Sequence, residues 1–274
     1  MSFQFDHFIH VVNSPEKAIE QFTRVGLHAV NGGRHENHGT YNALSYFNSL
    51  SYVELLGIFD RTLVEKASEQ KHSLRDTIVR NEYQEGTTRI AFRTENIERV
   101  AKAFKEAGLE VFGPIDFSRK RPDGGLVTWK LLFAGKEGQY PELPFFIQWD
   151  ETDEERLSSL SEQGTIGDHA IGRTKLLSVG ITCENGEATV KKWSQLLQHS
   201  IGESFIDESL NAKAHTLIVP GGNVIFYEPL GDGKVEEVLD TKGEKPFLLE
   251  IENEQLDEEI KLFDVIYRFK INNN

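Results

Sequence analysis

The chain has 274 residues, a formal net charge of −14 and 38% hydrophobic residues, enough for two ordinary domains with real cores. A chain this acidic repels nucleic-acid phosphates and anionic lipid headgroups, so we expect neither a nucleic-acid-binding nor a membrane-surface protein. The basic cluster Arg119-Lys120-Arg121 is too small to change that expectation.

The cysteine content and the N-terminal segment indicate in which cellular compartment the protein is expected. The chain has one cysteine, Cys183, which excludes an internal disulfide and a cysteine-rich zinc site. The segment MSFQFDHFIHVV lacks the basic region and long apolar core of a signal peptide. No apolar stretch approaches the roughly 20 residues that a membrane span needs. We therefore expect a soluble protein of a reducing compartment, most simply the bacterial cytoplasm.

The first sixty residues carry the signals of a strand, a helix and three more strands. Residues 5–12 form an apolar run rich in Phe, Ile and Val, which is typical of a buried strand. Ser14 and Pro15 are a helix N-cap and first helical position, and Gly26 is expected to end the helix. Further strands are expected at 27–31, 42–47 and 52–58.

The same order returns in residues 87–150, after a segment at 60–86 whose apolar spacing predicts linker helices. The expected elements are a strand at 88–93, a helix at 97–107, and strands at 109–112, 127–133 and 145–149. The copies align without gaps through the helix, with an offset of 82 residues from Gly26 to Gly108. Such a repeat usually buries a face that neither unit buries alone. We therefore expect an α+β fold in which paired βαβββ modules, 1–59 and 87–150, form one domain around a cleft.

Residues 151–274 predict a charged linker and a weaker copy of the pair. We interpret 151–169 as the linker and 170–274 as a degenerate second domain. The expected elements are strands at 176–183, 216–219 and 224–228, a helix at 187–199, and strands at 247–251 and 265–269 around a helix at 255–263.

Five segments in residues 1–150 carry a resemblance to a known family. They are FDHFIHVV, GGRHENHGTYNAL, YVELLG, RPDGGLVTWKL and LPFFIQWD, in this order. With the repeat, they resemble the vicinal-oxygen-chelate superfamily, and more narrowly its bacterial glyoxalase-like group of uncharacterised proteins. The resemblance implies tandem glyoxalase-like domains and small-molecule chemistry in the cleft of the N-terminal one. Over 170–274 it depends on topology alone.

The resemblance also implies where site residues lie: early on the first strand and in the last strand of each module. In the first module these positions hold His7 and Glu54. The offset places Arg89 at the position of His7, and aligning YVEL with FIQW places Gln148 at that of Glu54. His7, Glu54 and Gln148 could hold a divalent metal such as Zn, Mn, Fe or Ni. Arg89 cannot be a ligand, because a protonated guanidinium has no lone pair to offer.

Two roles for Arg89 stay open. It pairs with Glu54, or it binds the carboxylate or phosphonate of an anionic substrate. We favour the anion over the metal, because a positive charge near the site opposes a dication. His7 and Glu54 are then acid/base groups, and the substrate-binding residues are Asn42, Arg89, Trp129 and Gln148.

Three further histidines receive structural interpretations. His10 is an odd number of residues from His7, so it is expected to face the packing helix on the other side of the strand. His35 and His38 lie in a Gly-flanked polar segment and are expected to be solvated.

The functional hypothesis is an enzyme of unassigned specificity, with lyase, isomerase or metal-assisted chemistry on an oxygen-rich or anionic metabolite. Two alternatives stay open: a non-catalytic protein that sequesters an antibiotic-like molecule, and a structural module with an inactive cleft. The expected partner is a small-molecule ligand. The sequence leaves open whether the cleft closes within the chain or across a homodimer.

Overall fold

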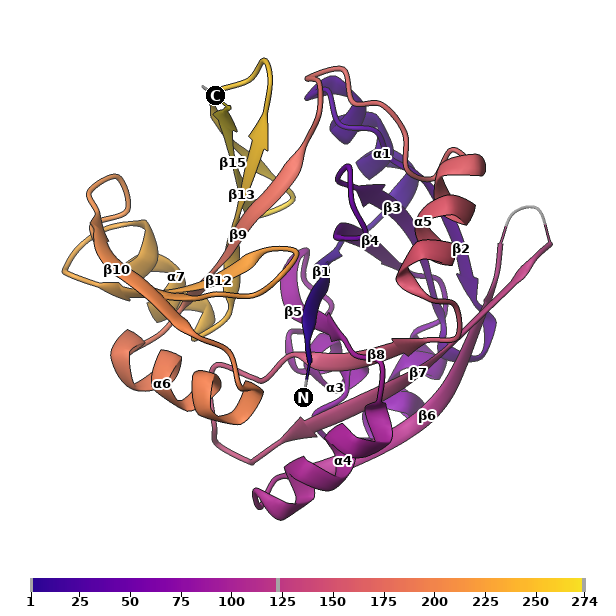
Figure 1. Ribbon diagram of the computed structural model, residues 1–274, viewed down its shortest axis with the longest axis horizontal. Coiled ribbons are helices and arrows are strands. Elements are labelled where there is room, and N and C mark those ends of the chain that lie inside the picture. Colours follow the sequence, from indigo (N-terminus) through magenta and orange to yellow (C-terminus); the bar gives the residue numbers. More distant parts are fainter. Residues whose placement is uncertain (1, 122–123, 273–274) are drawn as a thin grey trace.

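The strands of the described chain form two sheets, a closed barrel and an open sheet, which lie side by side (Figure 1). The computed structural model describes residues 2–121 and 124–272. Pro122 and Asp123 of the RPDGGLVTWKL segment lie outside these residues. The predicted α+β fold of paired modules is confirmed.

The barrel consists of two βαβββ modules joined by two helices. The first module contains β1 (Gln4–Val11), α1 (Pro15–Arg24), β2 (Val30–His35), β3 (Thr40–Tyr46) and β4 (Tyr52–Ile58), with a 3₁₀ turn at Glu36–His38. The linker helices are α2 (Arg61–Ser68) and α3 (Leu74–Arg80). The second module contains β5 (Gly86–Arg93), α4 (Ile97–Glu106), β6 (Glu110–Lys120), β7 (Leu126–Gly135) and β8 (Phe145–Trp149). The strands close in the order β1-β4-β3-β2-β6-β7-β8-β5.

The open sheet follows helix α5 (Asp153–Glu162) and repeats the modular order in reduced form. Its elements are β9 (Lys175–Thr182), α6 (Gly186–Leu197), β10 (Ile201–Asp207), β11 (Ala212–Leu217), β12 (Asn223–Pro229), α7 (Lys234–Lys242), β13 (Pro246–Asn253), β14 (Glu259–Leu262) and β15 (Val265–Ile271). The strand order is β10-β11-β12-β9-β13-β15-β14.

The pairing of β1 with β5 confirms the repeat and its offset of 82 residues. These strands are antiparallel, and Phe8 pairs with Ile90, its own counterpart in the second module. The flanking pairs are symmetric about this point: Phe5 pairs with Phe92, and His10 with Thr87. A pseudo-twofold axis therefore passes through the barrel between Phe8 and Ile90. Equivalent residues of the two modules consequently lie on opposite sides of this axis.

Two expectations about the elements are wrong, and the segment interpreted as a linker contains a helix. Residues 255–263 do not form a helix: they contain β14, whose backbone pairs with β15. Strand β6 is far longer than 109–112, because it runs beside β7 along its whole length. The charged segment 151–169 contains α5, which begins at a Thr152–Glu155 capping box.

The barrel and the open sheet share one hydrophobic core. A continuous cluster of buried residues runs from β1, α1 and α4 into α6, β13 and β15. In it, the Phe22 ring of α1 meets the Tyr267 ring of β15 edge-on at 5.5 Å between centroids. A second cluster fills the barrel interior. No helix of the described chain combines the length and apolar character that a membrane crossing requires.

His10 lies at the junction between the sheets. Its side chain contacts the open sheet: Nδ1 lies 2.8 Å from the Tyr267 hydroxyl, and Nε2 lies 3.0 Å from the Phe263 carbonyl oxygen. Because a carbonyl only accepts, Nε2 carries the hydrogen and Nδ1 accepts from Tyr267. Burial lowers the pKa of His10 to about 4, and the hydrogen bond to Phe263 offsets this only in part.

His10 therefore makes stability depend on pH. Its folded pKa lies below the unfolded value, so the unfolded chain binds more protons as pH falls from about 6.5 to about 4, and stability falls with it. Between pH 7 and pH 5 we expect a loss of about 2 kcal/mol from this group. His10→Gln should abolish that part of the loss in urea titrations at each pH. Parallel stability curves for wild type and variant between pH 7 and pH 5 would contradict the assignment.

Candidate functional site

The barrel encloses a narrow pocket of about 50 Å³ in which a few polar side chains lie among apolar and aromatic ones, and we call it the barrel pocket. Strands β1, β2, β3, β4, β6, β7 and β8 and helix α3 contribute to its walls, β2 through His35. Four predicted site residues line it, together with two arginines that the sequence did not suggest for this site: His7, Asn42, Glu54, Arg75, Arg119 and Trp129. Tyr46, Tyr52 and Trp149 add aromatic surface.

His7 is held by a carboxylate next to it in the chain. The backbone pairing between β1 and β5 shifts register between Phe5 and His7, which places Asp6 at an irregularity of the strand. The His7 Nδ1 atom lies 2.6 Å from Asp6 Oδ1. The imidazole stacks on the Tyr52 ring, with 4.6 Å between centroids. The Asp6 bond and the Tyr52 ring together fix the orientation of His7.

Asp6 is fully buried and is compensated by two other groups. Trp149 donates a hydrogen bond from Nε1 to Asp6 Oδ2 at 3.0 Å. Arg156 of α5 places Nη1 3.7 Å from the same oxygen. Burial by itself would raise the pKa of Asp6, but the His7 hydrogen bond and the Arg156 charge lower it below its ordinary value. Asp6 is therefore a carboxylate at neutral pH.

The other ring nitrogen of His7, Nε2, is directed toward Glu54. The His7 Nε2 atom lies 3.6 Å from Glu54 Oε2, too far for a hydrogen bond but close enough for both groups to reach one bound molecule. Asn42 donates from Nδ2 to Glu54 Oε1 at 2.5 Å. Its own Oδ1 is buried without a hydrogen-bond partner among the described residues.

Two arginines bring positive charge to the barrel pocket. Arg75 projects from α3, and the Ser73 hydroxyl accepts from the Asp76 amide to start that helix. Burial lowers the pKa of Arg75 to about 10, against the opposing effect of the Glu54 charge. Its Nε is buried and finds no hydrogen-bond acceptor within the described chain. Arg119 of β6 donates to the Gly32 carbonyl.

The expectation that His35 is solvated is wrong. His35 belongs to the end of β2, is 6% exposed, and places Nδ1 2.9 Å from the Thr40 hydroxyl. Burial and the charges of Arg75 and Arg119 hold its pKa well below the ordinary value. His38 is half-buried, because its ring stacks on Phe117 with 4.4 Å between centroids.

The prediction that Arg89 shares the pocket with His7 is wrong. Its guanidinium donates from Nη1 to the His72 carbonyl and from Nη2 to the Leu143 carbonyl. Its Nη1 lies 3.7 Å from the Glu142 carboxylate, so the predicted pair with Glu54 does not form. The reason is the pseudo-twofold axis: Arg89 is the counterpart of His7, but it lies across the axis, beside α3.

The prediction that Gln148 faces Glu54 is also wrong. Ile9 pairs with Glu54, and Ala91, its counterpart, pairs with Phe145, so Phe145 occupies the position of Glu54. The YVEL–FIQW alignment is three residues out of register, and an odd shift turns a strand residue to the other face. Gln148 consequently accepts from the Ile97 amide at the start of α4, with 2.8 Å between Oε1 and N.

The predicted metal ligands therefore do not converge. Gln148 is directed away from His7 and Glu54, and Arg75 interacts electrostatically with Glu54 instead. Among residues 2–121 and 124–272, no three His, Cys, Asp or Glu side chains are grouped to hold a metal ion. The donor set of the barrel pocket does not fit the divalent metal that the resemblance implied.

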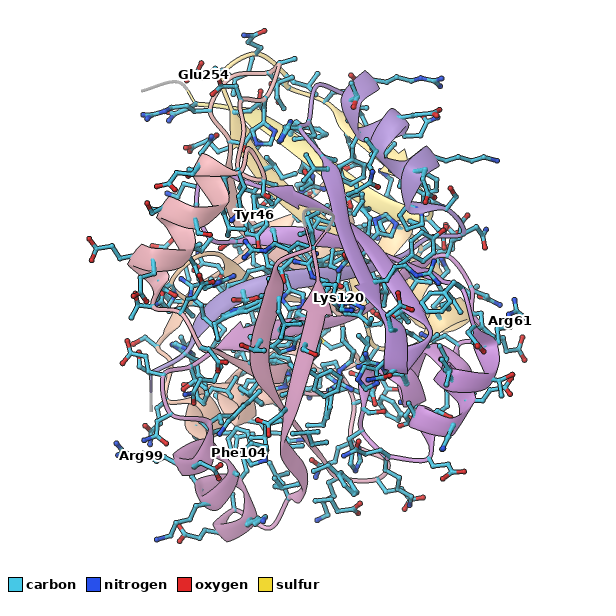
Figure 2. All side chains as sticks on the ribbon, turned by 90° about the vertical axis from the view of Figure 1, so that its right-hand side faces the viewer. Tyr46, Arg61, Arg99, Phe104, Lys120 and Glu254 are labelled. Atoms are coloured by element: carbon cyan, nitrogen blue, oxygen red, sulfur yellow. The ribbon has the colours of Figure 1, made fainter. Side chains whose placement is uncertain are left out.

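A wider hollow of about 200 Å³ adjoins the barrel pocket, and we call it the outer chamber. Leu44, Tyr46, Arg119 and Trp149 line both spaces. The far wall of the chamber is α5, including Arg156 and Ser159. In Figure 2, α5 borders one edge of the barrel near Tyr46, while Arg61 marks α2 at the opposite edge.

Comparisons with known proteins agree with this architecture. A family model described as a glyoxalase-like domain matches residues 5–197, from β1 to α6. A solved hypothetical protein from Staphylococcus aureus is 24% identical, with a TM-score of 0.80 over 98% of this chain and 100% of that one. A mutant 4-hydroxymandelate synthase from Streptomyces coelicolor is 11% identical, with a TM-score of 0.57 over 93% of this chain and 72% of that one. At these identities the likeness shows the fold alone. The search of curated proteins found no match.

Replacing Asp6 tests the geometry of the site without reference to function. In wild type, a neutral His7 should carry its hydrogen on Nδ1, because ionised Asp6 only accepts. Asp6→Asn should remove that constraint, so nitrogen-15 NMR of the imidazole should show Nε2–H character. The buried Arg156 then loses its counter-charge, and we expect a stability loss of about 3–5 kcal/mol in urea titrations.

The matched control is Asp153→Asn, which removes a carboxylate that pairs with Arg93 and is 45% exposed. Its cost should stay below about 1 kcal/mol. An unchanged His7 tautomer in Asp6→Asn would show that Asp6 does not set it.

Proposed function

Because the chain belongs to the glyoxalase-like domain family, we propose that it is an enzyme that transfers a proton on a small anionic metabolite bound in the barrel pocket. The observation that carries this proposal is the line of Asp6, His7 and Glu54, with arginine side chains at the same pocket. The fold alone does not specify chemistry, so the proposal depends on these side chains.

The Asp6–His7 pair supports a role of His7 as general base. With Nδ1–H donated to Asp6, a neutral His7 presents the lone pair of Nε2 to the pocket. When Nε2 takes a proton from a substrate carbon, the imidazolium gains an ion pair with Asp6. The buried carboxylate therefore interacts more strongly with the charged product of proton transfer than with the neutral imidazole, which lowers the barrier.

Glu54 supplies a second group that can hold a proton. Asn42 fixes one of its oxygens, and the other lies on the side of His7 Nε2. A substrate beside both groups could lose a carbon-bound proton to one of them and receive a proton from the other on the same face. Such a same-face transfer suits isomerisation or elimination next to a carbonyl group.

Arg75 and Arg119 support recognition of an anion. Arg75 is 6% exposed, so a negative group beside it interacts in a medium of low polarity. Its planar guanidinium suits a carboxylate, and it would also stabilise the enolate oxygen that forms on proton loss. These two arginines take the role that the sequence assigned to Arg89.

The proposal is tested by proton exchange with solvent, which requires no knowledge of the product. A panel of small α-oxo, α-hydroxy and β-oxo carboxylates is incubated with the protein in deuterium oxide and followed by proton NMR. Loss of a carbon-bound proton signal from at least one member is expected. His7→Gln should slow that exchange by about a hundredfold or more, and Glu54→Gln should slow it as well.

The matched control is His215→Gln, which removes a 3% exposed histidine of β11 in the open sheet. It should exchange at the wild-type rate. Thermal shifts against the same panel separate binding from chemistry. Ligands that raise the melting temperature but never exchange would favour the sequestering protein, and a panel without shifts or exchange would overturn the proposal.

A further inference from the structure

The outer chamber carries an excess of positive charge directly beside the barrel pocket. Among the described residues that line it, Arg119, Arg121 and Arg156 face a single acidic side chain, the exposed Glu151. This excess stands out in a chain with a net charge of −14. A hollow lined in this way concentrates anions next to the barrel pocket.

We infer that the ligand is a dianion: one anionic group lies in the barrel pocket at Arg75, and the second lies in the outer chamber at Arg156 and Arg119. This inference rests on the proposed function, because it takes the barrel pocket as the place of reaction. It adds the substrate class, which is a short carbon chain with a carboxylate at one end and a carboxylate or phosphonate-like group at the other.

Arg156 is built to receive an anion. Its side chain is 3% exposed, and its guanidinium carbon lies 4.0 Å from the centre of the Trp149 ring. Within the described chain its Nη1 has no hydrogen-bond partner, since the Asp6 oxygen at 3.7 Å is too distant for one. Burying such a donor unpaired is costly. An oxygen of a ligand in the outer chamber would accept the missing hydrogen bond from Arg156 Nη1.

Arg119 links the two spaces. It lines both of them, and Gly32, to whose carbonyl it donates, lines the outer chamber. A Cβ at Gly32 would overlap the Asn42 amide and approach Arg119 Nη1 within 2.9 Å. Glycine therefore lets Arg119 and Asn42 lie next to each other at the junction. A ligand whose carbon chain passes this junction has Asn42, which is hydrogen-bonded to Glu54, on one side and the outer chamber on the other.

Isothermal titration with molecules of matched chain length tests the inference. Butyrate carries one anionic group, succinate carries two carboxylates, and phosphonopropionate replaces one carboxylate by a phosphonate. Succinate or phosphonopropionate should bind at least about tenfold more tightly than butyrate, the usual value of one charge-assisted hydrogen bond. The tighter of the two identifies the group that the chamber receives, and glutarate and adipate measure the span.

Two variants separate the chamber from the barrel pocket. Arg156→Gln should remove the advantage of the dianions, so that the ratio of dianion to butyrate affinity falls to about one. Arg75→Gln should weaken all three molecules. Because Arg156 also compensates Asp6, the affinity of butyrate serves as the internal check that the folded pocket is intact.

Ser159→Glu gives a second test that keeps Arg156 and Asp6. Ser159 is half-buried and lines the outer chamber, so a carboxylate there should repel or replace the second anion and weaken dianions by about tenfold. The control is Ser158→Glu, which adds the same charge at an exposed position of α5. Ser158→Glu should change neither the affinity of butyrate nor that of the dianions by more than about twofold.

The outcomes distinguish the two proposals. Equal affinity for butyrate and the dianions in the wild-type protein, with Arg75→Gln weakening both, would overturn the second anionic group and leave the proposed function standing. A dianion advantage that survives both Arg156→Gln and Ser159→Glu would place the second group outside the chamber and overturn the inference. Failure of every molecule to bind would overturn the inference together with the anion-binding part of the proposed function.

Discussion

The buried Asp6 carboxylate is the group on which the candidate site depends. It lies inside the barrel at 0% exposure, where an unpaired negative charge would be strongly destabilising. Three elements meet to compensate it: His7 from β1, Trp149 from β8 and Arg156 from α5. The same contacts that make Asp6 tolerable orient His7 toward Glu54. The same cluster of residues therefore serves both the stability of the fold and the proposed chemistry. Helix α5 belongs to this cluster, although it follows both modules in the sequence.

The pseudo-twofold axis explains why the two modules have different roles. Each module places a charged or polar residue at the equivalent point of its first strand, His7 in one and Arg89 in the other. Symmetry puts these residues on opposite sides of the axis, where each finds its own carboxylate, Glu54 or Glu142. On the other side, Arg89 donates from Nη1 and Nη2 to backbone carbonyl oxygens. On the His7 side, Arg75 Nε and Asn42 Oδ1 are buried without partners in the described chain, and on the other side Arg89 Nε is as well. What distinguishes the His7 side is that an imidazole and a carboxylate line the same pocket, and the proposed chemistry depends on these two groups.

Much of the barrel could be predicted from the sequence, because strong local signals coincide there. Ser14, Pro15 and Gly26 delimit α1, and the apolar runs locate β1, β5 and β8. The position of Gln148 could not be fixed, since two short apolar strands align almost equally well in several registers. Backbone pairing settles the register through Phe145, opposite Ala91. The full length of β6 could not be predicted either, because its outer half is polar and largely exposed. That half is a strand because it forms backbone hydrogen bonds with β7.

The positive charge of the pocket was missed for a related reason. Arg75 lies in a helix that reads as a charged linker, and Arg119 lies in a basic triplet that reads as a loop. Neither local pattern distinguishes a solvated arginine from a buried one, since burial is decided by how α3 and β6 pack on the barrel. One signal was nevertheless present, because a carboxylate such as Glu54 within an apolar strand requires a nearby compensating charge. The sequence could not show which cation supplies it, since the contact that draws Arg89 to Glu142 and leaves Arg75 to interact with Glu54 appears only in the structure.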